Sequence, residues 1–393
     1  MQSLRQSPTD PAFVQDPYPF YDRARAAGPL VFWEDYDMVA AFGQAEVHAL
    51  LRDRRFGRER PAEMPLPAPA HLAPWLATEA HSMLDAEPPR HTRLRGLVLR
   101  AFTSRRISAL GPDTETLCHA LVDRFPEGDF DLLQAYCTAV PVTVICRLLG
   151  VPEEDAPLLL DWSHRMVAMY QASRTRATED SAAAAAADFT AYLRAHVERR
   201  RSTPADDLIT RLIEAEEDGT RLSTDELIGT CILLLNAGHE ATVHGLGNGV
   251  KTMLQLGLDR RWLAPDTIAA TVEEILRYDP PLHMFTRYAY EDIEVFGHRF
   301  RRGDQVALML AAANRDPACW PDPHRFDPTR ALTTHTSLGG GLHFCVGAPL
   351  ARLEMQIALP ILFDRLPGLH LAEAPAYGDT YHFHGLTRLM VAP

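Results

Sequence analysis

The chain has 393 residues, 46% of them hydrophobic, and a formal net charge of -13 at pH 7. This length is ample for a large buried core, and the negative charge argues against nucleic acid as a general partner. The polar residues 1–10 and the lack of an apolar run near ~18 residues predict neither a secretory signal nor a membrane anchor. Six scattered cysteines without a CxxC pair disfavour a zinc ribbon or a disulfide scaffold and indicate the reducing cytoplasm.

Helical periodicity dominates the first two thirds of the chain. After a weak strand signal at Val31 and Phe32, amphipathic patterns predict helices over residues 37–51, 107–125, 135–149, 156–170, 183–200 and 207–217. Two stretches, 56–89 and 314–337, have no regular pattern. Irregular segments of this length in compact proteins are usually functional or mobile.

The longest helical pattern covers residues 224–256 and is apolar nearly all round at its centre, which predicts a helix that runs through the core. Ser223 or Thr224 can cap its start, and a further helix is expected over residues 265–277. Strand signals gather late in the chain, in residues 285–290, 293–296 and 305–310. Because no internal repeat and no convincing linker is present, we expect residues 1–393 to form a single domain.

One cysteine, Cys345, lies in the glycine-rich segment LGGGLHFCVG, residues 338–347, and a helical pattern follows from Ala351. Glycines let the backbone bend tightly and approach a bulky group closely. The amides and the dipole at a helix N-terminus stabilise a thiolate, and a thiolate can serve as an axial ligand to iron. Taken alone, a buried structural thiol is the simpler interpretation, so the assignment depends on the rest of the chain.

Two further pairs have helical spacing. Glu274 and Arg277 lie at i,i+3 on one helix face, and we expect Arg325 to close an ion-pair network with them. The alternative is a surface salt bridge of little energetic value. His91 and Arg95 lie at i,i+4 and suit a carboxylate or a phosphate, with a solvated basic helix as the alternative.

The segment AGHEAT, residues 237–242, lies in the middle of the predicted core helix. A glycine such as Gly238 costs a helix ~1 kcal/mol relative to alanine. A buried acid such as Glu240 is unfavourable unless it has a partner or a function. Both costs indicate a functional reason for the segment.

Together these patterns resemble the cytochrome P450 family, over essentially the whole chain and in the family's order. The cysteine segment is similar to the family's FGxGxHxCxG pattern, Glu274 and Arg277 to its ExxR helix, and residues 237–242 to its AGxETT helix. The resemblance implies a mainly α fold, a triangular prism with a small β-rich region. It also implies haem b, iron protoporphyrin IX, as cofactor, and monooxygenation, in which one oxygen atom of O2 enters a hydrophobic small molecule.

The resemblance further implies roles for single residues. Cys345 matches the proximal thiolate ligand of the iron, whose electron donation favours O–O cleavage. Glu240 matches the acid of the family's proton-delivery pair, and Ala237 and Gly238 belong to the cofactor-binding part of the central helix. Four residues match positions that usually hold the haem propionates: His91, Arg95, Arg287 and His343.

Two positions depart from the family pattern. Leu338 stands where the family usually has a phenylalanine beside the thiolate, and leucine keeps that environment apolar. Ala241 stands where the family usually has a threonine that helps to deliver protons during dioxygen activation. We expect ordered water, a substrate hydroxyl or the adjacent Thr242 to take over this role, and an oxygen-bearing substrate is therefore favoured.

An arginine cluster surrounds the helix of His91 in this acidic chain and consists of Arg90, Arg93, Arg95, Arg100, Arg105 and Arg106. It favours either plain solubility or the docking of a small acidic electron carrier. No GxGxxG motif follows a strand, so a fused reductase is not expected. The predicted partners are a separate ferredoxin, or else a flavodoxin, and its NAD(P)H reductase.

Candidate substrate contacts come from segments that overlie the distal haem face in the family: residues 61–83, 166–170, 234, 237, 282–285 and 382–385. They are mostly apolar, which suits a hydrophobic ligand. His283, His382 and His384 are either polar contacts for the substrate or internally satisfied histidines. Fatty acids, terpenoids, macrolide-like metabolites and small aromatics all fit this composition.

Three other functions fit parts of the sequence less well. A zinc hydrolase needs HExxH, with histidines at i,i+4 on one face, whereas His239 and His244 are five residues apart and point ~140° away from each other. A haem protein without turnover is favoured only by Ala241 and opposed by Cys345 and Glu240. A peroxide-driven haem-thiolate enzyme usually carries arginine and proline in place of the acid–threonine pair, so Glu240 opposes it too.

Overall fold

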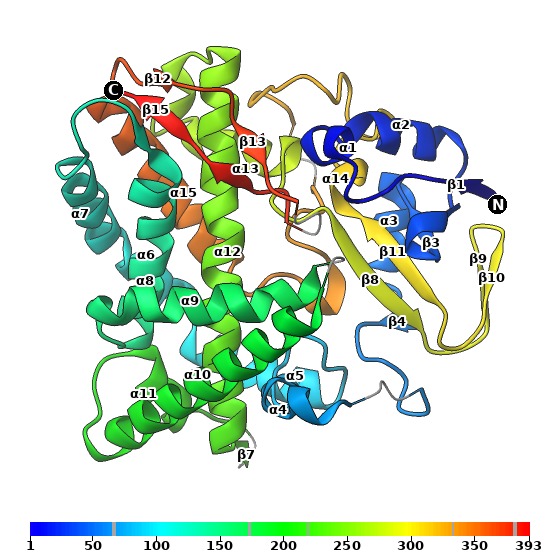
Figure 1. The fold of residues 1–393 in the computed structure, drawn as a ribbon, viewed down its shortest axis with the longest axis horizontal. Coiled ribbons are helices and arrows are strands. Elements are labelled where there is room, and N and C mark those ends of the chain that lie inside the picture. Colours follow the sequence, from blue (N-terminus) through cyan, green and yellow to red (C-terminus); the bar gives the residue numbers. More distant parts are fainter. Residues whose placement is uncertain (65–67, 172–173, 218–219, 332–333, 380–382) are drawn as a thin grey trace.

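The computed structural model describes residues 1–64, 68–171, 174–217, 220–331, 334–379 and 383–393 (Figure 1). Helices fill one side of the molecule and a mixed sheet the other. The described helices longer than ten residues are α5 (Arg90–Ala101), α7 (Gly111–Val122), α8 (Ala139–Leu149), α9 (Ala156–Val167), α10 (Arg176–Ser202), α12 (Thr224–Leu256), α13 (Ile268–Tyr278) and α15 (Ala348–Arg365). The shorter ones are α1 (Pro11–Gln15), α2 (Tyr18–Ala26), α3 (Gln44–Leu50), α4 (Ala73–Ala80), α6 (Ser104–Ala109), α11 (Leu208–Glu214) and α14 (Leu310–Ala313).

Helix α12 runs through the helical part from end to end, and α8, α9, α10, α13 and α15 pack on it. Its start is fixed by a capping box in which Ser223 accepts from the Glu226 amide and Glu226 accepts from the Ser223 amide. Its end is fixed by Gly257 at φ +57°. The range predicted for this helix, residues 224–256, is confirmed at both ends, because the start and end signals both lie in the local sequence.

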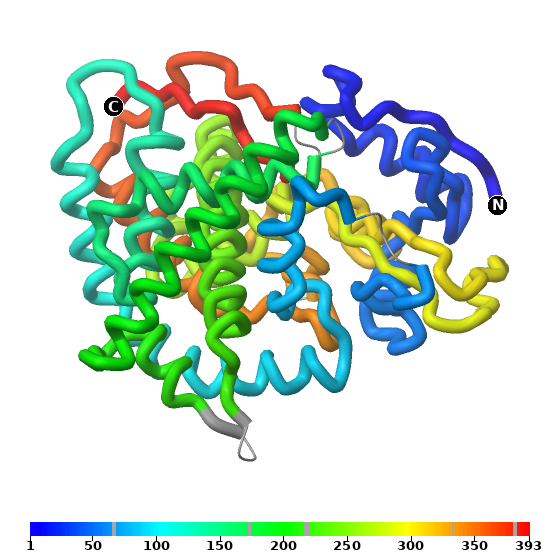
Figure 2. The backbone as a smooth tube through the Cα atoms, turned by 60° about the horizontal axis from the view of Figure 1, so that its bottom comes forward, coloured from blue at the N-terminus to red at the C-terminus, as the bar shows by residue number. Residues whose placement is uncertain are grey.

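Helices α9 and α10 pack against each other and both contact α12. Figure 2 shows them as green tubes in front of the yellow-green α12. The alanines of α10 at positions 182, 183, 185 and 186 are buried, which allows close approach of neighbouring backbones. The alanine run is therefore a small-sided packing face of a helix, as expected from alanine's helix propensity.

The main sheet has the strand order β1-β2-β3-β11-β8-β4. Its strands are β1 (Gln2–Leu4), β2 (Val31–Trp33), β3 (Met38–Ala41), β4 (Phe56–Gly57), β8 (Met284–Ala289) and β11 (Gln305–Met309). Smaller pairings join β9 (Ile293–Val295) with β10 (His298–Phe300), β5 (Phe130–Asp131) with β15 (Met390–Ala392) and β12 (His370–Leu371), β13 (Ala376–Tyr377) with β14 (Leu386–Arg388), and β6 (Glu216–Glu217) with β7 (Thr220–Arg221). The three late strand predictions are confirmed as β8, β9 and β11.

The helix predicted over residues 37–51 is wrong in its first half. Met38–Ala41 forms β3, which pairs antiparallel with β2 and parallel with β11, and Gly43 then caps α3. The partner strand β11 lies more than 260 positions away, so pairing across the sheet overrides the local helical pattern. Within the described residues, no helix is both long and apolar enough to cross a membrane.

Candidate functional site

The loop that carries Cys345 is shaped by glycines and closed by a backbone hydrogen bond. Gly339 and Gly341 have φ of +71° and +63°, a region that other residues rarely adopt. A Cβ on Gly341 would lie 2.6 Å from the Leu51 carbonyl oxygen. The Cys345 amide donates to the Leu338 carbonyl at 3.0 Å, and α15 begins three residues later. The loop therefore holds Cys345 at the N-terminal end of α15.

The surroundings of Cys345 balance burial against positive charge. Burial raises the pKa of its thiol, while hydrogen bonds from the Gly347 and Ala348 amides and the nearby Arg95 and Arg352 act in the opposite direction. The residue as a whole is half-buried. The amides and guanidinium groups offset part of the effect of burial, so they stabilise a thiolate at a buried site that would otherwise oppose it more strongly. Cys345 is thus suited to bind a cation through sulfur.

A second group, the histidine–arginine cluster, consists of His91, Arg95, Arg287 and His343. The rings of His91 and His343 lie 4.4 Å apart, and His343 Nε2 is 2.9 Å from the Glu87 carboxylate. Arg287 is 2% exposed, as is His91. Arg95 lies close enough to act on the pKa of His91, and Arg287 on that of His343. The structure therefore brings together the four residues that the resemblance matched to propionate positions, and it adds Glu87.

Buried nitrogen atoms in the histidine–arginine cluster lack partners. Within the described residues, neither His91 Nδ1 nor Arg287 Nη2 has a hydrogen-bond acceptor. Burial, reinforced by Arg58, lowers the pKa of Arg287 to about 9, and burial, reinforced by His343, lowers that of His91 to about 4. These groups need negative charge nearby, which an anionic ligand would supply. Because Arg58 lies in the irregular stretch 56–89, no spacing pattern pointed to it.

The middle of α12 has one accessible face. Ala237 is exposed and Gly238 and Ala241 are half-buried, whereas the turns before and after them are mostly buried. A Cβ on Gly238 would make only ordinary contact with Ile145, at 3.6 Å. This face of α12 therefore lets a ligand approach the helix closely. The neighbouring Thr242 is buried and donates its hydroxyl to the Gly238 carbonyl at 3.1 Å.

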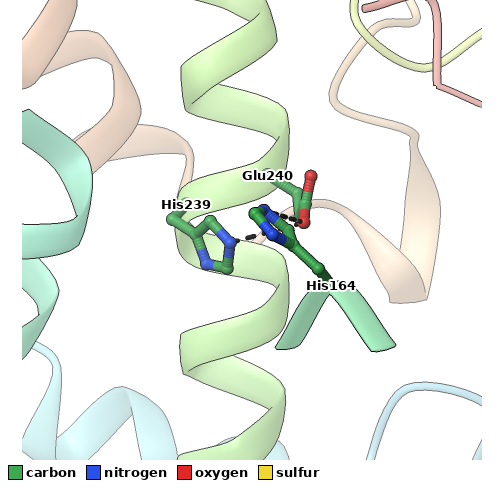
Figure 3. A group of neighbouring side chains, drawn as sticks. All are labelled: His164, His239 and Glu240. Atoms are coloured by element: carbon green, nitrogen blue, oxygen red, sulfur yellow. Dashed lines mark ion pairs between the residues drawn. The ribbon is translucent and has the colours of Figure 1, made fainter. Parts of the chain in front are cut away.

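Glu240 lies among three histidines, of which the sequence pointed to only two. His239 Nε2 is 3.4 Å and His164 Nε2 is 3.3 Å from Oε1 of Glu240, while His244 Nε2 is 3.6 Å from Oε2. Burial raises the pKa of Glu240, but the histidines outweigh this effect and hold it well below its usual range. His164 comes from α9, more than 70 positions earlier in the chain, so local spacing does not reveal it (Figure 3).

The Glu274–Arg277 pair is buried, so the surface alternative is wrong. Arg277 donates to both Glu274 oxygens at 2.7 and 2.8 Å. The expected third member, Arg325, is a wrong assignment. The Arg330 guanidinium contacts Glu274 at 3.3 Å, and Arg325 contributes its backbone carbonyl, which accepts from Arg277 at 3.1 Å. Both arginines lie in the same irregular stretch, whose path follows from its turns and not from periodicity.

The chain is similar to known proteins along nearly its whole length. The cytochrome P450 family model matches residues 267–366. The cytochrome P450 monooxygenase PikC from Streptomyces venezuelae is 38% identical, over 92% of this chain and 87% of its own. This chain belongs to the cytochrome P450 family. The 6-deoxyerythronolide B hydroxylase of Saccharopolyspora erythraea is also 38% identical, over 92% and 91% of the two chains. The crystal structure of P450BioI with an acyl carrier protein has a TM-score of 0.92 and 34% identity, covering 97% and 99%.

Family membership makes the protein a haem-dependent monooxygenase of the P450 fold, with haem b as its cofactor. The residues present fit this group. Haem brings two carboxylates, and the histidine–arginine cluster has buried donors without acceptors. Haem also brings an iron that accepts a thiolate, and Cys345 lies under amides and arginines that favour one. The glycine and alanine face of α12 leaves room for a flat ring system.

Several predicted substrate contacts have other roles. His384 Nδ1 lies 3.0 Å from a buried Asp279 oxygen and its ring stacks on Tyr377, and His283 Nδ1 is 2.8 Å from the Tyr21 hydroxyl. Both histidines therefore bind other protein groups through Nδ1, while Nε2 of His384 is buried without a hydrogen-bond partner among the described residues. His382 lies outside the described residues. Two methionines, at positions 166 and 169, are buried in the hydrophobic core.

Proposed function

We propose that Cys345 is the thiolate ligand of the haem iron and that His91, Arg95, Arg287 and His343 hold the haem propionates, within one haem domain of residues 1–393. The position of Cys345 carries this proposal, since its sulfur faces two backbone amides and two arginines at the start of α15. When bound, the haem supplies the iron at which dioxygen is activated. The protein's own residues orient the haem, exclude water and move protons.

The proposed electron donor is a separate ferredoxin, with a flavodoxin as the alternative, each with its NAD(P)H reductase. Of the arginine cluster around α5, Arg93 pairs with Glu226, Arg106 with Asp206 and Arg90 with Glu59. Because carboxylates partly neutralise these three arginines, the positively charged surface around α5 is smaller than the six arginines of the sequence suggest.

The docking surface that we assign to the carrier has an apolar centre beside Arg95. Leu99, Leu342 and Phe344 are among the few large apolar side chains with more than a third of their surface exposed. Arg95 donates to the Phe344 carbonyl at 2.7 Å, next to the proposed ligand Cys345. Apolar contact combined with positive charge suits a small acidic carrier.

The proposed substrate is a hydrophobic molecule that bears oxygen. The departure at Ala241 supports this choice, because a substrate hydroxyl can take the place of the threonine hydroxyl. Relatives are named for vitamin D(3) and for 6-deoxyerythronolide B, and one solved structure holds a fatty acid on an acyl carrier protein. These names include a fatty acid, one of the hydrophobic classes that the sequence left open. The cytoplasmic location stays a prediction.

For proton supply we propose Glu240 as the acid that exchanges protons with solvent through His164. The side chain of His164 is 58% exposed, and that of Glu240 only 11%. Protons can therefore pass from solvent through His164 to the buried Glu240 on α12. Thr242 is the weaker candidate, because its hydroxyl proton is engaged by the Gly238 carbonyl. We therefore assign the last proton transfer to water or to the substrate's own hydroxyl.

Replacing Ala241 with threonine is expected to leave product formed per electron consumed unchanged or lower. The native arrangement already supplies protons, and the added hydroxyl would occupy the accessible face of α12 where substrate or water is placed. The measurement is product against NAD(P)H consumed, with the compound that gives the strongest spin-state shift. Thr242→Ala serves as the companion variant and should leave this ratio unchanged. A sharp rise in coupling in the Ala241→Thr variant would refute the assignment.

The experiment that tests the whole proposal is turnover under ¹⁸O2 with a ferredoxin and its reductase. We expect a product that carries a single ¹⁸O atom, formed only when the electron donor is present. The control replaces the reductase system with hydrogen peroxide. Turnover supported far better by peroxide than by the donor would instead favour a peroxide-driven enzyme.

A further inference from the structure

Three ligating groups from two helices meet beside the centre of α12. One ring nitrogen of His164 on α9, one of His239 on α12 and a carboxylate oxygen of Glu240 on α12 all lie within 4.8 Å of one another. Figure 3 shows dashed lines from both imidazole rings to the Glu240 carboxylate, with His164 reaching across from its own helix. This set combines two imidazoles with one carboxylate, the ligand types that zinc takes in proteins.

Two of the three distances in this group match those around a tetrahedral ion. With bonds of about 2.0–2.1 Å to nitrogen and oxygen, neighbouring ligand atoms of a tetrahedral zinc lie about 3.4 Å apart. Oε1 of Glu240 is 3.3 Å from His164 Nε2 and 3.4 Å from His239 Nε2. The two ring nitrogens lie within 4.8 Å of each other, so an ion between the three atoms requires at most that they move closer together.

The hydrogen bond on the other side of the His239 ring prepares it as a ligand. His239 Nδ1 lies 2.7 Å from the Leu235 carbonyl oxygen, which can only accept, so Nδ1 carries the hydrogen. A neutral ring then presents a lone pair from Nε2, which has no hydrogen-bond partner among the described residues although His239 is only 2% exposed. This lone pair faces a carboxylate oxygen, and two acceptors in contact need either a proton or a cation between them. An imidazole that donates its second nitrogen to a carbonyl is the usual arrangement of a metal-binding histidine.

We propose that His164, His239 and Glu240 form a zinc site that is separate from the haem. Three protein ligands leave a fourth position for water, and the exposed side of His164 gives the ion a path from solvent. The i,i+5 spacing of His239 and His244 disfavoured zinc at that pair, and His164 now supplies the second imidazole from α9. His244, whose Nε2 is 3.6 Å from the other Glu240 oxygen, lies outside the three-atom group and can hold the carboxylate in place.

Zinc at this site would connect α9 to α12. It would also occupy the Glu240 carboxylate, to which we assign proton exchange, so bound zinc should lower the product formed per electron consumed. That consequence rests on the proposed function, whereas zinc binding itself does not. Binding and coupling are therefore tested separately.

The binding test is calorimetric titration of Zn²⁺ into the ferric, haem-loaded enzyme after treatment with a chelator. We expect one zinc per haem. Removing a residue that only supports a metal ligand typically weakens metal affinity by about tenfold or more. His164→Ala removes a ligand itself, so it should weaken zinc affinity by at least about as much. His239→Asn is the second variant, since its amide nitrogen can keep the bond to the Leu235 carbonyl while the Nε2 ligand is lost.

The matched control is His71→Ala, which removes the imidazole of another histidine–glutamate pair, with Glu179 at 2.7 Å. Among the described residues, no third ligating group joins that pair. Its zinc affinity should equal that of the native enzyme. The zinc site would be overturned if the His164→Ala and His239→Asn variants bound Zn²⁺ as tightly as the native enzyme. It would also be overturned if the native enzyme showed no saturable Zn²⁺ binding. Coupling measured with and without Zn²⁺ then separates the two proposals: zinc that binds without changing coupling leaves the site standing and removes Glu240 from proton delivery.

Discussion

Replacement of Cys345 by serine is expected to abolish monooxygenation and to change the spectrum of the bound haem. Sulfur is the only soft donor that the loop offers, and a serine hydroxyl does not ionise under the Gly347 and Ala348 amides that favour a thiolate. The reduced native protein with carbon monoxide should show the long-wavelength Soret band of thiolate ligation, and the variant should lack it. Product formation in the variant should fall below detection.

The control is Cys319→Ser, because Cys319 is the other half-buried cysteine and the remaining four are buried. Its sulfur lies near Asp316, and burial raises the pKa of its thiol. This variant should keep both spectrum and activity. A histidine-type spectrum in the native protein that Cys345→Ser leaves unchanged would reject Cys345 as the ligand and the mechanism that depends on it.

Features set by neighbouring residues were predictable from the sequence. The range of α12 follows from a capping box at one end and Gly257 at the other, and the cysteine loop from its glycines and the start of α15. The two halves of the histidine–arginine cluster were predictable only through the family resemblance, since His91 and Arg287 are almost 200 positions apart.

Features set by distant contacts were not predictable in the same way. Strand β3 exists because β2 and β11 pair with it, which no local pattern encodes. His164 joins Glu240 only because α9 crosses α12. Arg330, and not Arg325, reaches Glu274 because the irregular chain between them turns back, so that the Arg330 side chain also donates to the Arg325 carbonyl.

The second large effect is expected at Arg277, which is 1% exposed. Its guanidinium makes five hydrogen bonds, two to Glu274 and three to the backbone carbonyls of Asn314, Pro323 and Arg325. Removing one partner of a buried ion pair costs about 3–5 kcal/mol, a large part of the roughly 5–15 kcal/mol that holds a protein folded. Arg277→Leu should therefore accumulate poorly and hold little haem.

A milder variant keeps this prediction measurable. Arg277→Lys retains the charge, but an ammonium has three donors and cannot serve five acceptors, so its free energy of unfolding in urea should fall between those of the native protein and the leucine variant. The matched control is Arg147→Lys. Arg147 makes the same two-pronged contact with Glu153, at 2.7 and 3.3 Å, but on the partly exposed surface, where such pairs are worth about 0–1 kcal/mol. If the two lysine variants lost equal stability, burial and carbonyl bonding would not be what makes Arg277 important. In that case the irregular segment from Asn314 to Arg325 would owe its path to other contacts.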